Sequence, residues 1–194
     1  MFNSKIILAS KSQTRFQILK SAGLNVRQVK SSVNESKYKE IEENNQRLSL
    51  TLAYEKAKNV SNMENTHIGF VIGADQVLTL KSKRYSKALS LIEAKHQLKE
   101  LRGETHTLIT SVSILKNRKK VFELSQTSHL TMHHFSDEFL DNYLKKTSNK
   151  ILNSVGCYNI EGVGIQLFSK IEGDFFSILG LPLMQVLSFL RQEV

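Results

Sequence analysis

The sequence predicts an α/β fold, because short apolar strands alternate with amphipathic helices and a long hairpin follows late in the chain. Strands are expected from Lys5 to Ala9 and from Val26 to Ser31, and the hairpin from Thr105 to Met132. The chain has 194 residues, of which 40% are hydrophobic and 23% charged. That length and composition predict a single domain, residues 1–194, with a sizeable core.

In the strand expected from Phe70 to Leu80, FVIGADQVLTL, an acid and an amide interrupt an apolar run. An unpaired carboxylate is costly to bury, so Asp75 needs a partner or a metal if it lies inside the protein. It is therefore either a turn residue beside Gly73 or a residue with a chemical role. Taken alone, the strand favours the turn.

Helices are expected where apolar residues recur every three to four positions. The ranges are 13–22, 49–60, 91–101, 137–146 and 182–190. Gly23 and Gly103 are placed to end the first and third of these helices, and Ser136 to begin the fourth. Ser36–Gln46 is polar and is a candidate flap over a ligand, whereas Lys81–Arg84 is expected to form a polar turn.

The net charge of +9 favours either a polyanionic partner or merely a lysine-rich surface. A nucleic-acid-binding protein is expected to cluster its basic residues with aromatic residues between them. Here the lysines are spread along the chain and tryptophan is absent. Charge alone does not decide between the two interpretations.

A single cysteine, Cys157, excludes an internal disulfide bond and indicates a reducing compartment, so we expect a cytoplasmic protein. The most apolar C-terminal run, Ile178–Leu190, is shorter than the roughly 18 apolar residues of a membrane span. The histidines, His106 among them, show no spacing typical of a metal site.

Several stretches, taken in order, resemble the motifs of one enzyme family. ILASKSQTRFQIL is similar to the pattern LASxSPRRxELL and matches it at Ser10, Ser12 and Arg15. The series continues with LAYEKAK, FVIGADQ, YSKA, LRGETHTLITSV and SVGCYNIEGVGIQLFSKIEGDFFSILGLPL. Together these stretches resemble the Maf-like nucleoside triphosphate pyrophosphatases over nearly the whole chain. Gln13 and Thr14 depart from the pattern, which has proline and arginine at these positions.

The resemblance implies a long, bent, mixed β-sheet with flanking helices, in two lobes around a cleft, similar to the inosine triphosphate pyrophosphatases. It implies hydrolysis of a nucleoside triphosphate between the α- and β-phosphorus, which keeps non-standard nucleotides out of nucleic acids. The implied cofactor is Mg²⁺ or Mn²⁺, and the implied partner is the nucleoside triphosphate. No stable nucleic-acid complex and no membrane association are expected, and a homodimer is left open.

The same resemblance assigns the candidate site residues. Asp75 is the expected general base, and Glu35 and Asp75 are the expected metal ligands. The expected substrate-binding residues are Ser10, Ser12, Arg15, Lys56, Gln76, Lys87 and Glu161. Arg15, Lys56 and Lys87 are expected to hold the triphosphate, because cations stabilise charge on phosphoryl oxygens.

Two residues bear on the base of the substrate. Gln76 and Glu161 depart from the pyrimidine-preferring pattern of the family and resemble the subfamily that hydrolyses 7-methylguanosine triphosphate. A carboxylate only accepts hydrogen bonds, so Glu161 suits the N–H donors of a guanine edge, and its charge suits a cationic methylated base. Thr14 stands where that subfamily has tryptophan.

Two alternatives remain open. A nucleotide- or nucleic-acid-binding regulatory protein on the same scaffold is favoured by the changes at Gln13, Thr14 and Asn34, the last where the family has aspartate. The retained Asp75 and Lys56 argue against it. A protein without any ligand would leave Asp75 and the glycine-rich C-terminal stretch unexplained.

Overall fold

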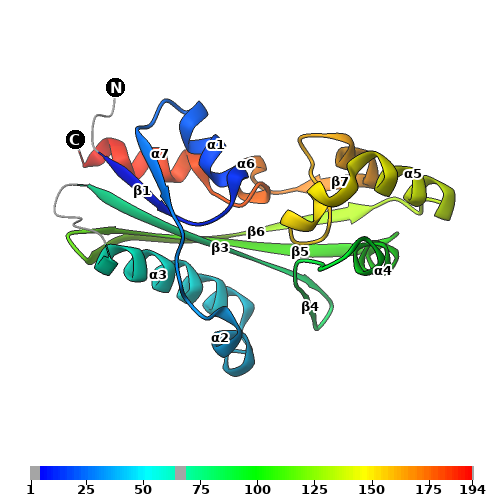
Figure 1. Ribbon diagram of the computed structural model, residues 1–194, viewed down its shortest axis with the longest axis horizontal. Coiled ribbons are helices and arrows are strands. Elements are labelled where there is room, and N and C mark those ends of the chain that lie inside the picture. The colour runs from blue at the N-terminus through cyan, green and yellow to red at the C-terminus, as the bar shows by residue number, and fades with distance from the viewer. Residues whose placement is uncertain (1–4, 64–68, 194) are drawn as a thin grey trace. The chain divides into compact units, whose positions relative to one another are not determined.

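The computed structural model describes residues 5–63 and 69–193, which form a seven-stranded mixed sheet flanked by helices (Figure 1). The strands are β1 (Ile6–Ala9), β2 (Val26–Val29), β3 (Phe70–Leu80), β4 (Lys83–Tyr85), β5 (Thr105–Lys116), β6 (Lys119–Met132) and β7 (Phe168–Glu172). The helices are α1 (Gln13–Ser21), α2 (Glu35–Ile41), α3 (Asn45–Met63), α4 (Leu91–Leu101), α5 (Asp137–Thr147), α6 (Phe175–Ile178) and α7 (Leu183–Gln192), with 3₁₀ turns η1 (Ser148–Asn153) and η2 (Val163–Leu167). The predicted α/β class is confirmed.

The strands follow the order β2-β1-β3-β5-β6-β7, and β4 pairs with β3. β1 pairs in parallel with both β2 and β3, whereas the β3–β4 and β6–β7 pairs are antiparallel. Asn117 and Arg118 connect β5 to β6, and both have positive φ angles, 51° and 64°. Two such residues form the tight turn that joins hairpin strands, so the predicted hairpin is confirmed.

The chain divides into two compact units, in agreement with the two expected lobes. The first consists of residues 1–76, 109–126 and 174–194, and the second of residues 77–108 and 127–173. β3, β5 and β6 each pass from one unit into the other. Neither unit is a continuous segment, and the single domain of residues 1–194 stays a prediction.

In the first unit, helices cover both faces of the sheet. α1 and α7 lie on one side of β1 and β3, and α3 lies on the other (Figure 1). Alternate residues of β3 serve the two faces: Phe70, Ile72 and Ala74 join the cluster with α1 and α7, whereas Val71 joins the cluster with α3. This two-residue period places Asp75 on the α3 face and Gln76 on the opposite face.

In the second unit, α4, α5 and η1 contact one another. Leu98 and Leu101 of α4 and Leu140 and Tyr143 of α5 are buried. The Tyr143 hydroxyl donates a hydrogen bond to the backbone oxygen of the buried Cys157, at 3.1 Å. The helix expected after Ser136 is confirmed, because the Ser136 side chain accepts the backbone N–H of Phe139 as an N-cap.

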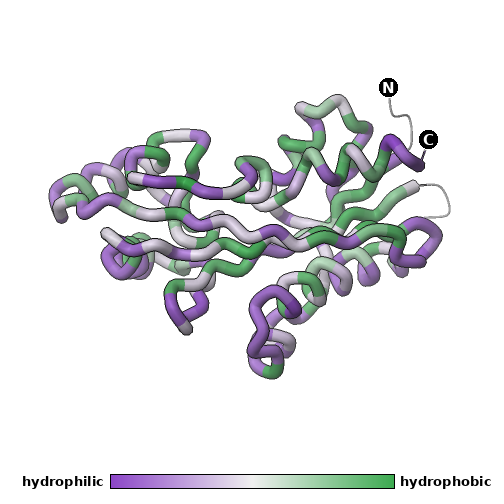
Figure 2. The backbone as a smooth tube through the Cα atoms, turned by 180° about the vertical axis from the view of Figure 1, so that it is seen from behind, coloured by the Kyte–Doolittle hydropathy of each residue, from purple (hydrophilic) through white to green (hydrophobic). Residues whose placement is uncertain are grey.

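Within the polar segment Ser36–Gln46, α2 extends to Ile41 and α3 begins at Asn45, and its role as a flap over a ligand stays a prediction. Asn34 caps α2, and none of the residues of this helix is buried. Figure 2 shows mainly hydrophilic colours along α2. A helix without a buried face has no apolar stripe, so its sequence gives no periodic signal.

Three further short elements were not predicted. The polar turn expected over Lys81–Arg84 is shorter, because Lys83–Tyr85 returns as strand β4. β7 and α6, at Phe168–Glu172 and Phe175–Ile178, fall within the glycine-rich C-terminal stretch. No helix in residues 5–63 and 69–193 is long and apolar enough to cross a membrane.

His106 of β5 is completely buried in the second unit. Its Nε2 lies 2.8 Å from the Tyr158 hydroxyl, and its ring contacts the rings of Tyr158 and Phe168. Nδ1 has no hydrogen-bond partner among the described residues. Burial lowers the pKa of His106 from 6.5 to about 4, because the imidazolium form would lose its hydration.

We expect the protein to lose stability as the pH falls from about 6.5 towards 4, because the unfolded chain binds a proton that buried His106 does not. This single group should lower the free energy of unfolding by about 2 kcal/mol between about pH 7.5 and about pH 5. Urea unfolding across this range measures the effect. His106→Gln should remove this part of the pH dependence, whereas His133→Gln, at an exposed position, should keep it. An unchanged slope in His106→Gln would contradict the assignment.

Candidate functional site

Asp75 lies in β3 of the first unit, where only 6% of its surface is exposed. The residue is not in a turn, so the interpretation of Asp75 as a turn residue is wrong. Its backbone oxygen accepts a hydrogen bond from the Ser49 hydroxyl of α3, at 3.3 Å. Because Asp75 points to the α3 face, its carboxylate meets the side chains of that helix.

The partner of the Asp75 carboxylate is Lys56 of α3. The distance from Lys56 Nζ to Asp75 Oδ1 is 2.6 Å, and that from the same nitrogen to Glu35 Oε1 is 2.8 Å. Glu35 is the first residue of α2, and its other oxygen lies 3.3 Å from Lys39 Nζ, one turn further along this helix. One lysine therefore bridges the two carboxylates that the sequence assigned to a metal.

Glu35 is held in its charged form by its neighbours. Burial alone would raise the pKa of this carboxyl, but the ammonium groups of Lys56 and Lys39 outweigh burial and lower the pKa to about 2. The ion pair between Glu35 and Lys56 therefore persists at neutral and mildly acidic pH.

A close approach between β3 and α3 makes the ion pair possible. A Cβ atom at Gly73 would lie 2.0 Å from the Ala53 backbone oxygen and 2.8 Å from the Ala57 backbone nitrogen. Only glycine therefore fits at this position. The contact brings the backbones of strand and helix together two residues before Asp75 and within one turn of Lys56.

The loop after β1 meets the same end of the sheet. Because β1 is parallel to β2 and β3, the carboxyl ends of these three strands lie at the same end of the sheet. The chain leaves β1 through α1 on one face and enters β3 from α3 on the other. Ligands of open α/β sheets bind at such a reversal of strand connections.

Ser10 and Ser12 shape this loop. The Ser10 hydroxyl accepts a hydrogen bond from the Ser12 backbone nitrogen, at 3.1 Å, and the Ser12 side chain caps α1 by accepting the Arg15 N–H, at 3.3 Å. Arg15 turns inward: its Nε donates to the Gly180 oxygen at 2.6 Å and its Nη1 to the Ala74 oxygen at 2.8 Å. This guanidinium group therefore joins the loop to β3 and to the segment before α7.

Gln76 lies on the face opposite to Asp75. Its side-chain nitrogen lies 2.9 Å from the Thr110 hydroxyl and 3.1 Å from each of the backbone oxygens of Ser177 and Ile178. These acceptors occupy the amide donor, so Gln76 secures α6 against β3 and β5. Glu35, Lys56 and Asp75 thus share one cluster, whereas Gln76 faces away from it.

Comparison with known proteins identifies the family. A family model described as Maf-like protein matches residues 5–193. The chain belongs to the Maf-like protein family. It is 42% identical to a 7-methyl-GTP pyrophosphatase of Bartonella henselae, over 98% of this chain and 96% of that protein. It is 43% identical to a nucleoside triphosphate pyrophosphatase of Caulobacter vibrioides, over 96% of this chain and 94% of that protein.

Among solved structures, a HAM1 protein from Coxiella burnetii superposes with a TM-score of 0.44 and 13% sequence identity. The superposition covers 69% of this chain and 75% of that chain. A likeness of this size adds nothing to the family assignment, which depends on the sequence matches.

Two predicted site residues of this Maf-like protein belong to the second unit. Lys87 is exposed in the segment after β4. Glu161 is also exposed, and its backbone nitrogen donates to the Asn159 side chain at 3.1 Å. Both side chains are therefore at the surface of that unit.

Sequence analysis missed two lysines at the edge formed by β1 and β2. Lys30 directly follows β2, and Lys11 lies between Ser10 and Ser12. Contact with the Lys30 ammonium group lowers the pKa of Lys11, so two like charges lie close together. A lysine within two residues of the end of each of two parallel strands is a signal that the sequence contains, and such a pair favours an anion between its members.

The chemistry of the cluster formed by Glu35, Lys56 and Asp75 fits a divalent cation. No three His, Cys, Asp or Glu side chains converge anywhere in residues 5–63 and 69–193. Mg²⁺, however, is commonly held by one or two carboxylates together with substrate phosphates and water. Glu35 and Asp75 already share one positive group, the Lys56 ammonium, and these two carboxylates would hold the cation.

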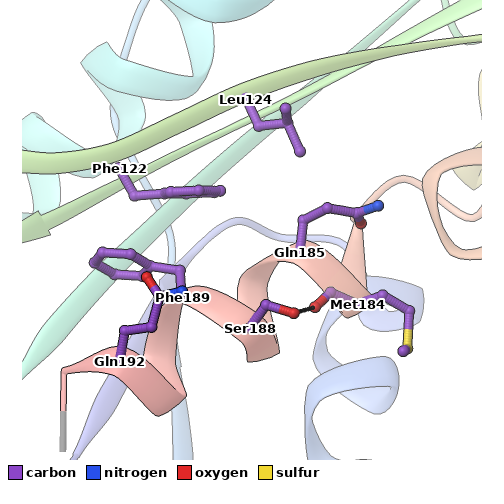
Figure 3. A pocket seen from close by; sticks show the side chains of 7 residues that line it. All are labelled: Phe122, Leu124, Met184, Gln185, Ser188, Phe189 and Gln192. Atoms are coloured by element: carbon purple, nitrogen blue, oxygen red, sulfur yellow. Dashed lines mark hydrogen bonds between the residues drawn. The ribbon is translucent and has the colours of Figure 1, made fainter.

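A pocket in the first unit has different chemistry (Figure 3). It lies between β6 and α7, has a volume of about 320 Å³ and is lined by Phe122, Leu124, Met184, Gln185, Ser188, Phe189 and Gln192. None of these side chains is charged at neutral pH, so the pocket does not suit a triphosphate.

We expect Gly73→Ala to separate Lys56 from Asp75, because a methyl group at this position overlaps the backbone of α3. Overpacking of this kind costs about 1–3 kcal/mol of stability. Urea unfolding measures the loss. Gly162→Ala is the matched control, because the nearest atom to its Cβ would be 3.9 Å away. Equal stabilities of the two variants would show that α3 accommodates the methyl group.

Proposed function

We propose that this protein is a nucleoside triphosphate pyrophosphatase, which hydrolyses the bond between the α- and β-phosphorus to yield a monophosphate and pyrophosphate. The proposal rests on one observation: the buried Asp75 carboxylate shares the Lys56 ammonium with Glu35 at the carboxyl edge of parallel strands. Relatives named 7-methyl-GTP pyrophosphatase and nucleoside triphosphate pyrophosphatase, at about 40% identity, support it.

The reaction adds water across a P–O–P bond, so a group must accept a proton from the attacking water. We assign this step to Asp75, because a carboxylate within hydrogen-bonding reach of the water can act as a general base. A divalent cation bound by Glu35 and Asp75 would neutralise phosphate charge and lower the pKa of a bound water. Lys56 lies beside both carboxylates and can stabilise the charge that develops on the phosphoryl oxygens.

The remaining substrate contacts are proposed from the family resemblance, together with the local structure around each residue. Ser10 and Ser12 lie in the loop that opens α1, and the N-terminus of a helix favours an anion. Lys87 belongs to the second unit, and its contact with the triphosphate is proposed from the family resemblance alone. Arg15 was assigned to phosphate as well, but its bonds to Gly180 and Ala74 support a positioning role for this guanidinium group.

The alternative function is that of a nucleotide- or nucleic-acid-binding regulatory protein without turnover. Such a protein would release no pyrophosphate. A panel of triphosphates with Mg²⁺ or Mn²⁺, assayed for pyrophosphate, separates the two functions. The cytoplasmic location and the homodimer stay predictions.

We expect Asp75→Asn to lower turnover by about 10²–10⁴-fold, because the variant keeps the shape of the side chain and loses the base. Pyrophosphate release under saturating triphosphate measures this effect. Asp141→Asn is the control, since Asp141 is a half-buried carboxylate of the second unit, paired with Lys95, and should leave turnover unchanged. Full activity of Asp75→Asn in the presence of metal would refute the assignment of the base.

We further expect guanine-type or 7-methylguanosine triphosphates to be hydrolysed better than dTTP or UTP, because the Glu161 carboxylate can only accept hydrogen bonds. Glu161 is exposed and hence accessible to a ligand. Glu161→Gln should shift the ratio of kcat/KM values towards the pyrimidines, whereas Glu172→Gln, at an exposed position of β7, should not. A wild-type preference for dTTP and UTP would overturn the role of Glu161 but leave the pyrophosphatase function standing.

A further inference from the structure

The Lys56 ammonium group occupies the position between two carboxylates where a cation would bind. It lies 2.6 Å from Asp75 Oδ1 and 2.8 Å from Glu35 Oε1, and only 12% of the Lys56 side chain is exposed. Two of its three hydrogen-bond donors can therefore serve these two oxygens. Within this group of three side chains, the lysine balances one of the two negative charges.

A divalent cation needs the same oxygens. Mg²⁺ binds carboxylate oxygens at about 2.0–2.1 Å, which is closer than a hydrogen-bonded ammonium group can approach. An ammonium group left in place would also repel the incoming ion, and charges a few ångström apart interact strongly in a partly buried site. Lys56 and a metal ion thus compete for Glu35 and Asp75.

A lysine side chain is well suited to leave these carboxylates when another anion binds. Its ammonium group sits on a flexible chain of four carbons and can exchange one anionic partner for another. In the structure Lys56 pairs with the two carboxylates, whereas a bound triphosphate would offer it new anionic oxygens. The exchange would leave the carboxylates to the cation and the lysine to the phosphates.

We propose that Lys56 masks the Glu35–Asp75 pair in the nucleotide-free protein, so that a divalent cation binds these carboxylates only when the ammonium group leaves at least one of them. The inference rests on the proposed function, which supplies the cation and the triphosphate. It assigns to Lys56 a second task, the control of metal entry, beside its contact with phosphate.

The test is a titration of the nucleotide-free protein with Mn²⁺, in which electron paramagnetic resonance counts the free ion. Lys56→Met should bind Mn²⁺ at least about tenfold more tightly than the wild type, because the competing charge is gone. Lys39→Met is the matched control: it removes a positive charge from the same Glu35, but at an exposed position 3.3 Å away, and should change the affinity less than about threefold.

Two further variants secure the interpretation. Lys56→Gln keeps a hydrogen-bond donor beside the carboxylates and should gain affinity as well, even if Lys56→Met folds poorly. Adding Asp75→Asn to Lys56→Met should abolish the gain in Mn²⁺ affinity. In a thermal melt, Mn²⁺ should raise the melting temperature of Lys56→Met more than that of the wild type. A folded Lys56→Gln that binds Mn²⁺ no more tightly than the wild type, or an equal gain in Lys39→Met, would overturn the proposal.

Because nucleotide is absent from this titration, its outcome is independent of turnover. Failure of the proposed function would appear instead as the absence of pyrophosphate release by the wild-type protein with every triphosphate tested. If Lys56→Met gains affinity for Mn²⁺ but the wild-type protein releases no pyrophosphate, the competition between Lys56 and the metal stands and the proposed function fails.

Discussion

The bridge that Lys56 makes between Glu35 and Asp75 is the interaction on which the arrangement of the site depends. A carboxylate in a strand with apolar neighbours on both faces is stable as an ion only if a positive partner reaches it. The partner comes from α3, and it can reach the strand only because Gly73 allows the two backbones to touch. Stability of the strand and chemistry of the site therefore depend on the same contact.

The two-residue period of β3 divides its two central polar residues between different tasks. Asp75 faces α3 and the ion pairs, whereas Gln76 faces the other side and donates to Thr110 and to the backbone of α6. One strand thus supplies a reactive group to one layer and fixes a helix in the other. Asp75 Oδ1 and the side-chain nitrogen of Gln76 both have partners, which accounts for a buried strand that carries an acid and an amide.

Much of the fold could be predicted from the sequence, because the strands and the longer helices bury apolar faces whose period is visible in the chain. α2 could not be predicted, since a helix with no buried residue leaves no periodic pattern. The motifs indicated Glu35, Lys56 and Asp75, which the structure brings together. A motif does not show, however, which side chains bond to one another. Arg15 illustrates this limit: its partner Gly180 is 165 residues away, and only the fold makes them neighbours.

The division of the chain has a consequence for its synthesis. All of the second unit lies within residues 77–173, whereas the first unit also needs residues 174–194, which are synthesised after the second unit. The core beneath β1 and β3 includes Leu183, Val186 and Leu190 of α7, and Arg15 holds the Gly180 oxygen. A nascent chain can therefore complete the second unit before the unit that carries the ion pairs, which stays open until residues 174–194 have been made. A chain that stopped before residue 174 would lack the support that α7 gives to the site.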